Sequence, residues 1–378
     1  MIKQTLVSML LALSCTPALA LIKQNDAYES DDVSVTSFFD DTIDGDSQNA
    51  VLSTPRTLLL SPDKKHILLF DNNGYGVRVV DKTGKVTTTK VDLDRYPKLD
   101  MKQYKNGNML LTANNTIIQV TPNYTPYLFA GKRLTAAESD AKLAKRVQYI
   151  MGENIQKSSY SSQSEFDIPS SIIAIDDQGW MFIDGIFGNI FKFIDKKGIV
   201  TEVTGLDNLE NTERITVMQK NRDKLYLLSE QIVYEVTFDA ETNSASITSR
   251  WDNNTTSGEP QFHQLKGLAF DGNQVVVVDS ESGKILELKP NNKTKTLYQI
   301  QCSSIIRHSN VATCKPESTN DEAIFNSYGD IIKNPWDTGY IISDSSMNVL
   351  YRFREGQLSL FTGQLKNSGY LKTPIELK

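Results

Sequence analysis

Residues 177–195 read DQGWMFIDGIFGNIFKFID and pass from turn to strand chemistry twice within a short span. Asp177-Gln178-Gly179 is typical of a tight turn, because glycine and small polar residues tolerate the backbone angles of a reversal. The apolar run Trp180–Asp184 follows, and a second apolar run spans Asn189–Phe193. Two such runs joined by a short loop predict a pair of antiparallel strands.

This turn–strand–loop–strand pattern occurs six times along the chain. The first run of each copy ends at residue 71, 113, 184, 229, 279 or 344, which gives intervals of 42, 71, 45, 50 and 65 residues. The first runs are apolar at nearly every position, which predicts strands buried on both faces, whereas the second runs often alternate and should lie nearer the surface. A weaker apolar stretch precedes each pair and another follows most pairs, so each copy predicts four strands.

A base period of about 42–50 residues is that of a propeller blade. The sequence therefore predicts an all-β chain, a six-bladed β-propeller with four-stranded blades and one short helical insertion, over residues 53–378. A solenoid is the alternative, but ring closure protects the strand edges that an open array would expose. Residues 21–52 form an N-terminal segment that is a candidate for closing the ring.

The third copy resembles an NHL repeat. The matching residues are Phe166-Asp167-Ile168-Pro169, Ile173-Ala174-Ile175-Asp176, Gly179 to Asp184 and Gly188-Asn189-Ile190. The fifth copy, from Leu265 to Asp279, and the sixth, from Phe325 to Gly363, match again, whereas Ala113 and Ser229 replace the repeated Asp in the second and fourth. The resemblance covers roughly residues 53–363 and implies an NHL-like propeller without implying one activity.

The N-terminal residues 1–20, MIKQTLVSMLLALSCTPALA, have the features of a secretory signal peptide. Lys3 precedes a short apolar run, and Ala18-Leu19-Ala20 fits the cleavage site. Cys15 raises the alternative of a lipoprotein, but the residues before it match that pattern poorly. Cleavage after Ala20 would give an exported chain, periplasmic or secreted, with no transmembrane segment, and we expect a monomer.

The whole chain of 378 residues carries 40 Lys and Arg against 46 Asp and Glu, a net charge of −6. This mild acidic excess disfavours nucleic acid as a partner. Cys302 and Cys314 would remain as a pair after export, in a polar stretch that we expect to be a loop. We predict a disulfide between them, with two free thiols as the alternative.

Two insertions interrupt the repeat, at about residues 132–165 and 301–324. Thr135 and Glu138 form a capping box, which with the following apolar periodicity predicts a helix over about 136–151. Its polar face carries Lys142 and Arg146, and the second insertion carries Arg307 and His308. Both insertions join one blade to the next, so they should share one face of the ring, where these four residues are the candidate ligand-binding residues. Simple packing of either insertion on the propeller is the alternative.

The repeated Asp71, Asp184, Asp279 and Asp344 suggest either metal binding or fixed turns. We favour turns, because a carboxylate at a strand end accepts backbone N–H bonds. No cofactor is predicted, although the resemblance leaves calcium in the central tunnel open. The sequence contains no nucleophile elbow, Walker loop or zincin motif, so no catalytic residue is assigned.

The leading hypothesis is thus a binding scaffold for a protein, peptide or glycan, with the insertion-bearing face as the binding surface. A metal-dependent propeller hydrolase or lyase, of the lactonase or esterase kind, with its site at the central tunnel, is the alternative. A structural component of the cell envelope is a third possibility.

Overall fold

The computed structural model divides the chain into two compact units, residues 1–41 and residues 42–378. All described residues belong to the second unit. They are residues 42–364 except 62, 71–75, 91–97, 104–107, 114–115, 124, 132–158, 161–165, 167–168, 186–189, 207–208, 210–213, 254–260, 300–301, 309–310, 317–327 and 346. Within these residues the structure contains strands and turns and no helix, so the predicted helix at 136–151 lies outside the part described.

The strands form six antiparallel blades of four strands each, as the sequence predicts. The first three blades are β1 (Thr57–Leu60), β2 (Ile67–Phe70), β3 (Gly76–Val80) and β4 (Val86–Lys90); β5 (Lys98–Gln103), β6 (Met109–Ala113), β7 (Thr116–Val120) and β8 (Pro126–Ala130); and β10 (Ser170–Ile175), β11 (Gly179–Asp184), β12 (Ile190–Asp195) and β13 (Ile199–Glu202). The last three are β14 (Val217–Asn221), β15 (Lys224–Leu228), β16 (Val233–Asp239) and β17 (Ser244–Trp251); β18 (Leu265–Asp271), β19 (Gln274–Asp279), β20 (Lys284–Lys289) and β21 (Lys293–Gln299); and β24 (Tyr328–Lys333), β25 (Tyr340–Asp344), β26 (Val349–Arg354) and β27 (Gln357–Thr362).

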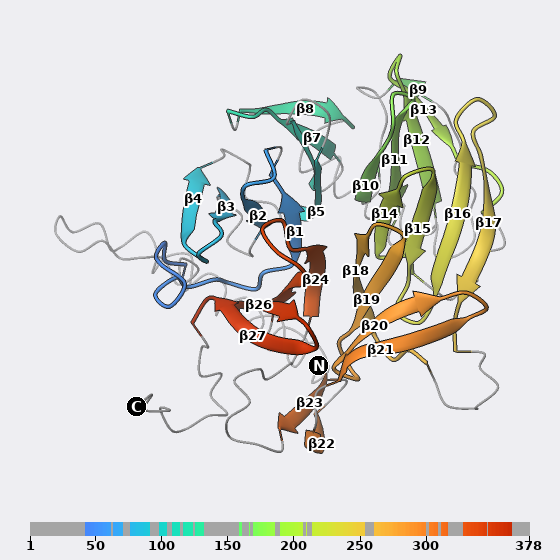
Figure 1. The fold of residues 1–378 in the computed structure, drawn as a ribbon. Coiled ribbons are helices and arrows are strands. Elements are labelled where there is room, and N and C mark those ends of the chain that lie inside the picture. Colours follow the sequence, from blue (N-terminus) through green and yellow to red (C-terminus); the bar gives the residue numbers. More distant parts are fainter. Residues whose placement is uncertain are drawn as a thin grey trace, which may run out of the picture. The chain divides into compact units, whose positions relative to one another are not determined.

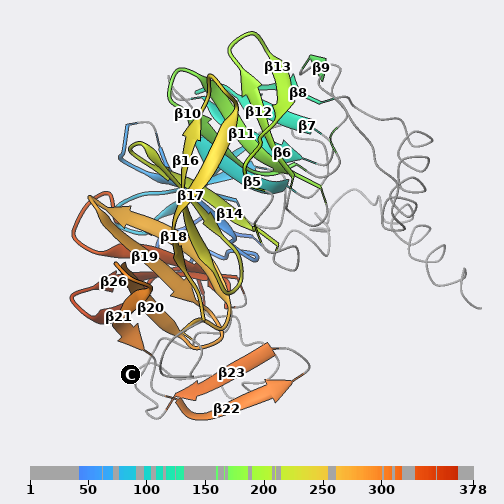
Figure 2. The same ribbon diagram turned by 90° about the vertical axis from the view of Figure 1, so that its right-hand side faces the viewer.

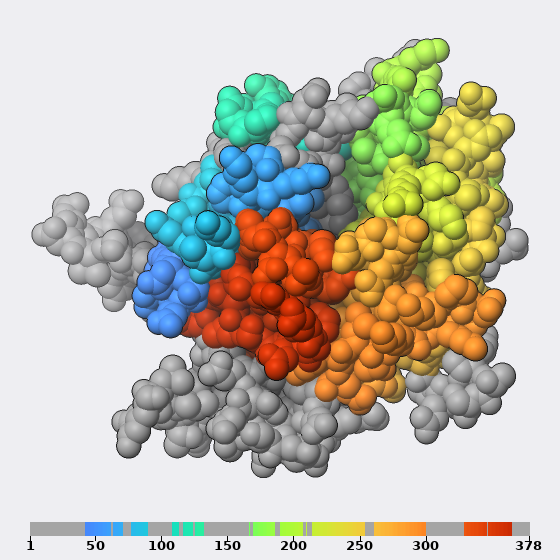
Figure 3. Space-filling view, viewed as in Figure 1, coloured from blue at the N-terminus to red at the C-terminus, as the bar shows by residue number. Residues whose placement is uncertain are grey.

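The first strands of the blades form the inner ring. Each contacts the first strand of the next blade, in the cycle β1, β5, β10, β14, β18, β24 and back to β1 (Figure 1). The space-filling view shows the same closure, with the red sixth blade directly beside the blue and cyan first blade (Figure 3). The closed ring excludes the solenoid alternative.

Two short pieces of strand lie outside this pattern, and the sequence pattern predicts neither. β9 (Ser159–Tyr160), from the first insertion, pairs with β13 and adds a fifth strand to the third blade. β22 (Cys302–His308) and β23 (Val311–Pro316) form a separate two-stranded sheet in the second insertion (Figure 2). The expectation of a loop around Cys302 and Cys314 was therefore wrong, because antiparallel pairing satisfies the backbone of this polar stretch.

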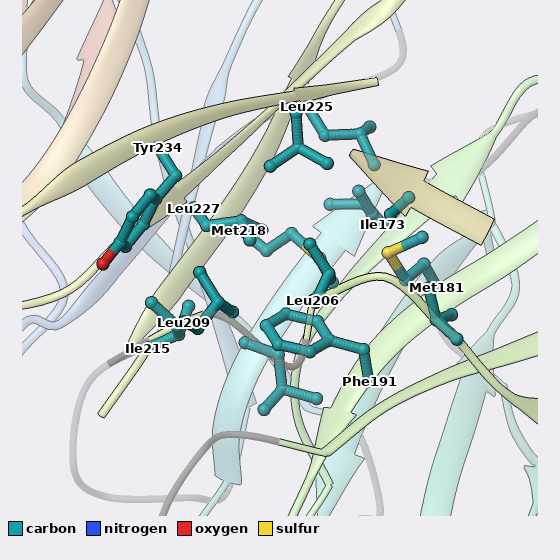
Figure 4. Close-up of a cluster of buried hydrophobic side chains, with 14 of the residues drawn as sticks. Ile173, Met181, Phe191, Leu206, Leu209, Ile215, Met218, Leu225, Leu227 and Tyr234 are labelled. Carbon is teal, nitrogen blue, oxygen red and sulfur yellow. The ribbon is translucent and has the colours of Figure 1, made fainter. Parts of the chain in front are cut away.

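Six apolar clusters hold the blades together, one between each neighbouring pair. In the cluster between the third and fourth blades, Met181 and Phe191 pack against Met218 and Leu227 (Figure 4). Because the second strand of each blade contributes alternate side chains to the clusters on its two sides, it is buried on both faces. β2 and β25 are buried at every position, as predicted from their continuous apolar runs.

Polar contacts between the inner strands supplement this packing. A carboxylate oxygen of the buried Asp330 accepts the N–H of Leu58 at 3.0 Å, which joins the sixth blade to the first. Ser171 Oγ accepts the N–H of Met218 at 2.6 Å in the same manner between the third and fourth blades. In β18 a Cβ at Gly267 would lie 2.8 Å from the N atom of Ile331, so the close approach of these two inner strands requires glycine.

The segment 42–52 contacts both the first blade and the end of the sixth. Gly45 bridges to Val86 in the outer strand β4. Gly363 and Gln364, just after β27, donate backbone N–H groups to the carbonyls of Ser47 and Ala50 at 3.2 and 3.0 Å. These contacts involve only part of the segment 21–52. That the whole segment closes the ring stays a prediction.

Arg78 connects the segment 42–52 to the first blade from a buried position. Its side chain is 2 % exposed, and Nη2 donates to the carbonyls of Ile43 and Val51 at 3.0 and 3.3 Å. The carboxylate of Asp44 lies 3.5 Å from the same nitrogen and also accepts the N–H of Thr88 at 2.8 Å. One guanidinium therefore fixes both ends of this segment.

We predict that Arg78→Met lowers the free energy of unfolding by about 2–3 kcal/mol, because buried carbonyls and a carboxylate lose a charged donor. Urea unfolding followed by circular dichroism measures the change. Arg56→Met, at an exposed position just before β1, is the matched control and should change stability by less than about 0.5 kcal/mol. Equal effects of the two substitutions would contradict this role of Arg78.

Glu235 forms the centre of a second polar network, between the fourth and fifth blades. Its carboxylate accepts hydrogen bonds from Tyr226 Oη at 2.8 Å and Thr248 Oγ1 at 3.0 Å, and forms an ion pair with Lys224. The ring of Tyr226 then reaches Phe270 in the next blade, at 5.1 Å between centroids. Burial raises the pKa of Glu235, but the hydrogen bonds from Lys224, Tyr226 and Thr248 outweigh it and hold the pKa below its usual value.

A carboxylate whose pKa is lowered by folding contributes stability above its unfolded-state pKa, and loses it as the pH falls through its folded-state pKa. Glu235→Gln should therefore be less stable than the wild type at neutral pH, with a gap that closes as the pH falls to about 3. Urea titrations across this range test it. Glu241→Gln, exposed in the β16–β17 turn, should show no such convergence. If the difference in unfolding free energy between the wild type and Glu235→Gln did not change with pH, the stabilising role of ionised Glu235 would be refuted.

Candidate functional site

The strand order places several features at one end of the propeller. In an antiparallel four-stranded blade, the second strand ends where the fourth strand leaves for the next blade. The long connections between β8 and β10 and between β21 and β24 therefore emerge at the same end as the second-strand termini. We call this the insertion-bearing end. The two connections are three blades apart in the ring of six, so they face each other across it.

Of the four predicted ligand-binding residues, the structure describes only the backbone of two. Lys142 and Arg146 lie outside the described residues. Arg307 and His308 end β22 and pair with Ala312 and Val311, so they stand at the tip of the β22–β23 hairpin. Their side chains lie outside the part of the structure that can be described, and their role in binding stays a prediction.

The disulfide is likewise untested. The hairpin register sets Cys302 opposite Pro316 and Cys314 opposite Ile305. The two cysteines therefore lie on neighbouring strands of one sheet. Their side chains are outside the description, so the bond between them remains a prediction.

The strand-end carboxylates fix the local backbone, as expected for two of the four. Asp344 accepts the N–H of Met347 at 2.9 Å, and Asp279 accepts three backbone N–H groups. Asp184 pairs with Lys192 Nζ at 2.6 Å, a contact that the sequence pattern did not indicate. Asp71 lies outside the described residues. Ser229 replaces the carboxylate in the fourth blade. Its Oγ accepts the N–H of Ile232 at 3.0 Å and so fixes the backbone after the strand in the same way.

Asp279 differs from its counterparts because an imidazole lies against it. Its side chain is fully buried, and Oδ2 and Oδ1 accept the N–H groups of His263 and Gln264, each at 2.9 Å. Nδ1 of His263 lies 3.5 Å from Oδ2. We define the Asp279 cluster as His263, Gln264, Asp279, Ser280 and Ser282.

The other members of the cluster hold this arrangement in place. Ser280 donates its N–H to the carbonyl of Gln264 at 2.9 Å, and its Oγ lies 2.9 Å from Gln264 Oε1. On the other side, the ring of Phe262 is fully buried among the apolar side chains between the fourth and fifth blades. His263 therefore lies between the buried Phe262 and Gln264, which is hydrogen-bonded to Ser280. It comes shortly before the inner strand β18. This position is at the inner rim of the insertion-bearing end.

Two polar atoms of the cluster lack hydrogen-bond partners within the described residues. They are Nδ1 of His263 and Oγ of Ser282, and both are buried. Buried polar atoms are normally paired, so two unpaired atoms around one carboxylate are a feature to be explained. Among the described residues, this cluster included, no group of three or more His, Cys, Asp or Glu side chains is placed to hold a metal ion.

Sequence reasoning left His263 unassigned. Its significance depends on Asp279, which is distant along the chain and adjacent only once β18 and β19 have paired. A usable signal did exist, because the Asp that ends each second strand must lie beside the residues that begin the first strand of the same blade.

We predict that Asp279→Asn lowers the free energy of unfolding by about 1–3 kcal/mol, because one carboxylate oxygen that accepts a buried N–H becomes a donor. Thermal and urea unfolding measure it. Asp223→Asn, exposed in the β14–β15 turn, is the matched control. If both variants unfold like the wild type, Asp279 does not fix the start of β18.

Comparison with known proteins supports the fold. No family model and no curated protein matches the sequence. Among solved structures, an auxiliary nutrient binding protein from Bacteroides ovatus aligns over 82 % of this chain and 71 % of its own, with 14 % identity and a TM-score of 0.54. One from Bacteroides thetaiotaomicron aligns over 78 % and 68 %, with 12 % identity and a TM-score of 0.51.

A streptogramin B lyase aligns over 85 % of this chain and 86 % of its own, with 11 % identity and a TM-score of 0.49. At these identities the likeness to solved structures shows the fold alone. The chain is thus a six-bladed β-propeller, and its membership of the NHL family remains an interpretation of the sequence. Within the described residues, no helix is long and apolar enough to cross a membrane.

Proposed function

We propose that this protein is an exported, NHL-like β-propeller, periplasmic or secreted, that binds a protein, peptide or glycan at its insertion-bearing end. The observation that carries the proposal is that the strands flanking the two long insertions and the Asp279 cluster all have the relevant ends at this end of the ring. Binding residues commonly lie on loops that a rigid scaffold positions. Here the scaffold is the ring of six apolar clusters.

The opposite end is built differently. There, neighbouring blades are joined by Lys220 with Asp176, Lys333 with Asp271, and Trp336 Nε1 with the carbonyl of Lys65 at 2.8 Å. These polar groups are occupied in holding blades together, which favours the insertion-bearing end for recognition. Two structural neighbours are auxiliary nutrient binding proteins, and nutrient binding is a function of the same class.

Export rests on the signal-peptide features of residues 1–20. The net charge of −6 supports a partner other than nucleic acid. A monomer with no resident cofactor is sufficient for such a role.

Binding by the mature chain, residues 21–378, to arrays of defined peptides and of neutral and acidic oligosaccharides tests the proposal. We expect at least one ligand, whose affinity falls by about tenfold or more when the hairpin 302–316 is replaced by a short Gly-Ser linker, since hairpin contacts are lost. Asp223→Asn, in the exposed β14–β15 turn at the opposite end, should leave the affinity unchanged.

Circular dichroism must show that the replaced chain keeps its fold. A ligand that is indifferent to the replacement and to Asp279→Asn, but is lost on substitution of Lys333 or Asp176, would place recognition at the wrong end. Failure of the folded chain to bind any member of the arrays would also count against the proposal.

A further inference from the structure

The carboxylate of Asp279 is held as a fixed negative charge beside His263. It is fully buried and accepts N–H groups from His263, Gln264 and Ser282, the last at 3.4 Å. Within the described residues no lysine or arginine pairs with it. The imidazole of His263 lies beside it, with Nδ1 at 3.5 Å from Oδ2.

This contact determines which nitrogen of His263 carries the proton in the neutral ring. The Asp279 carboxylate is not hydrogen-bonded to Nδ1, but at 3.5 Å its charge favours the tautomer with hydrogen on Nδ1 by electrostatic attraction. Nε2 then carries a lone pair and accepts hydrogen bonds. The side chain is 33 % exposed, and because Nδ1 is buried, the exposed part is the opposite edge of the ring.

We propose that His263 Nε2 accepts a hydrogen bond from a hydroxyl group of a carbohydrate, and that the Asp279 cluster is the subsite for that sugar. This inference rests on the proposed function of the insertion-bearing end and names the ligand class. It requires a ligand with donors, because the tautomer set by Asp279 offers an acceptor.

The surroundings favour a neutral, hydroxyl-rich ligand over an anion. Gln264, half-buried beside His263, has an uncharged amide that both donates and accepts, which suits a neighbouring hydroxyl on the same sugar ring. The nearby Lys266 lies 3.8 Å from the carboxylate of Glu230, which offsets its charge. An acidic sugar would meet the buried carboxylate of Asp279 unfavourably.

The preorganisation of the site supports recognition over a purely structural role. The backbone of residues 263–264 is fixed by Asp279 and Ser280, and Phe262 is anchored in the apolar cluster behind it. An imidazole held in this way loses little freedom on binding, so its hydrogen bond contributes more to affinity than that of a mobile side chain.

The test compares the mature wild-type chain with His263→Ala and with His66→Ala. His66 is the matched control, because its side chain is 41 % exposed and it lies at the start of β2, at the opposite end. The probes are neutral hexasaccharides of glucose, mannose, xylose and galactose, and an oligogalacturonate as the acidic counterpart of the galactose series. Isothermal titration calorimetry measures the affinities.

We expect a neutral oligosaccharide to bind more tightly than its acidic counterpart. His263→Ala should weaken that binding about tenfold, the effect of one well-placed hydrogen bond, and His66→Ala should change it by less than about twofold. Thermal unfolding checks that His263→Ala is folded.

Nitrogen NMR of the unmodified chain gives a second readout that needs no stable variant. The chain has three histidines, so the signals of His66, His263 and His308 can be assigned by single substitutions. Neutral His263 should show the Nδ1–H tautomer, and the sugar should shift its Nε2 resonance while that of His66 stays unchanged.

The opposite outcomes are informative in different ways. An Nε2–H tautomer, an Nε2 resonance that ignores the bound sugar, or preferential binding of the oligogalacturonate would overturn the carbohydrate subsite. So would binding of peptides alone, but peptide binding that depends on the 302–316 hairpin would leave the proposed function standing. The absence of every ligand, sugar or peptide, or binding that depends on Lys333 or Asp176 at the opposite end, would overturn both.

Discussion

The structure depends on the burial of each second strand between two neighbouring blades. β2, β15, β19 and β25 are apolar in succession, so neither face of any of them can be left to water. A single blade covers at most one of these faces, and an open row of blades would leave its two terminal strands half covered. Ring closure is therefore required by the strands themselves. It brings Leu58 and Asp330, which lie at opposite ends of the sequence, into one hydrogen bond.

Closure here uses complete blades. The first blade is formed from β1–β4 and the last from β24–β27, so no strand is exchanged between them. The junction relies instead on the apolar cluster between these blades, which includes the fully buried Ala50 and Leu52 from the segment 42–52. That segment has little apolar periodicity of its own. Its place in the structure comes from a buried guanidinium, Arg78, in a strand that the repeat pattern does identify.

The architecture could be predicted from the sequence because it rests on local chemistry repeated six times. β6 and β25 begin and end where the apolar runs do, and the turns at Gly179 and Gly272 are glycine turns with positive φ. The hairpin β22–β23 was missed because its residues carry neither continuous nor alternating apolar character, and backbone pairing alone defines it. β9 was missed for a related reason, since two residues added to the edge of β13 leave no periodic signal.

The candidate site is harder to derive from sequence because it is a departure from the repeat. Six equivalent positions end the second strands. Among the described ones, Asp184 pairs with a lysine, Asp279 and Asp344 accept backbone N–H groups, and Ala113 and Ser229 replace the carboxylate. Only knowledge of the register shows that Asp279 lies beside His263, and only the side-chain packing shows that Nδ1 of that ring is buried.

The two ends of the ring differ in how far packing restricts their sequences, and this difference bears on function. Substitutions within the six clusters would disturb two blades at once, and the end opposite the insertions is crossed by ion pairs between blades. The insertion-bearing end is the part of this ring that can vary in length without loss of packing, as the two long connections already show. A departure such as His263, placed at that end on a backbone fixed by a buried carboxylate, is therefore better explained by recognition than by the needs of the fold.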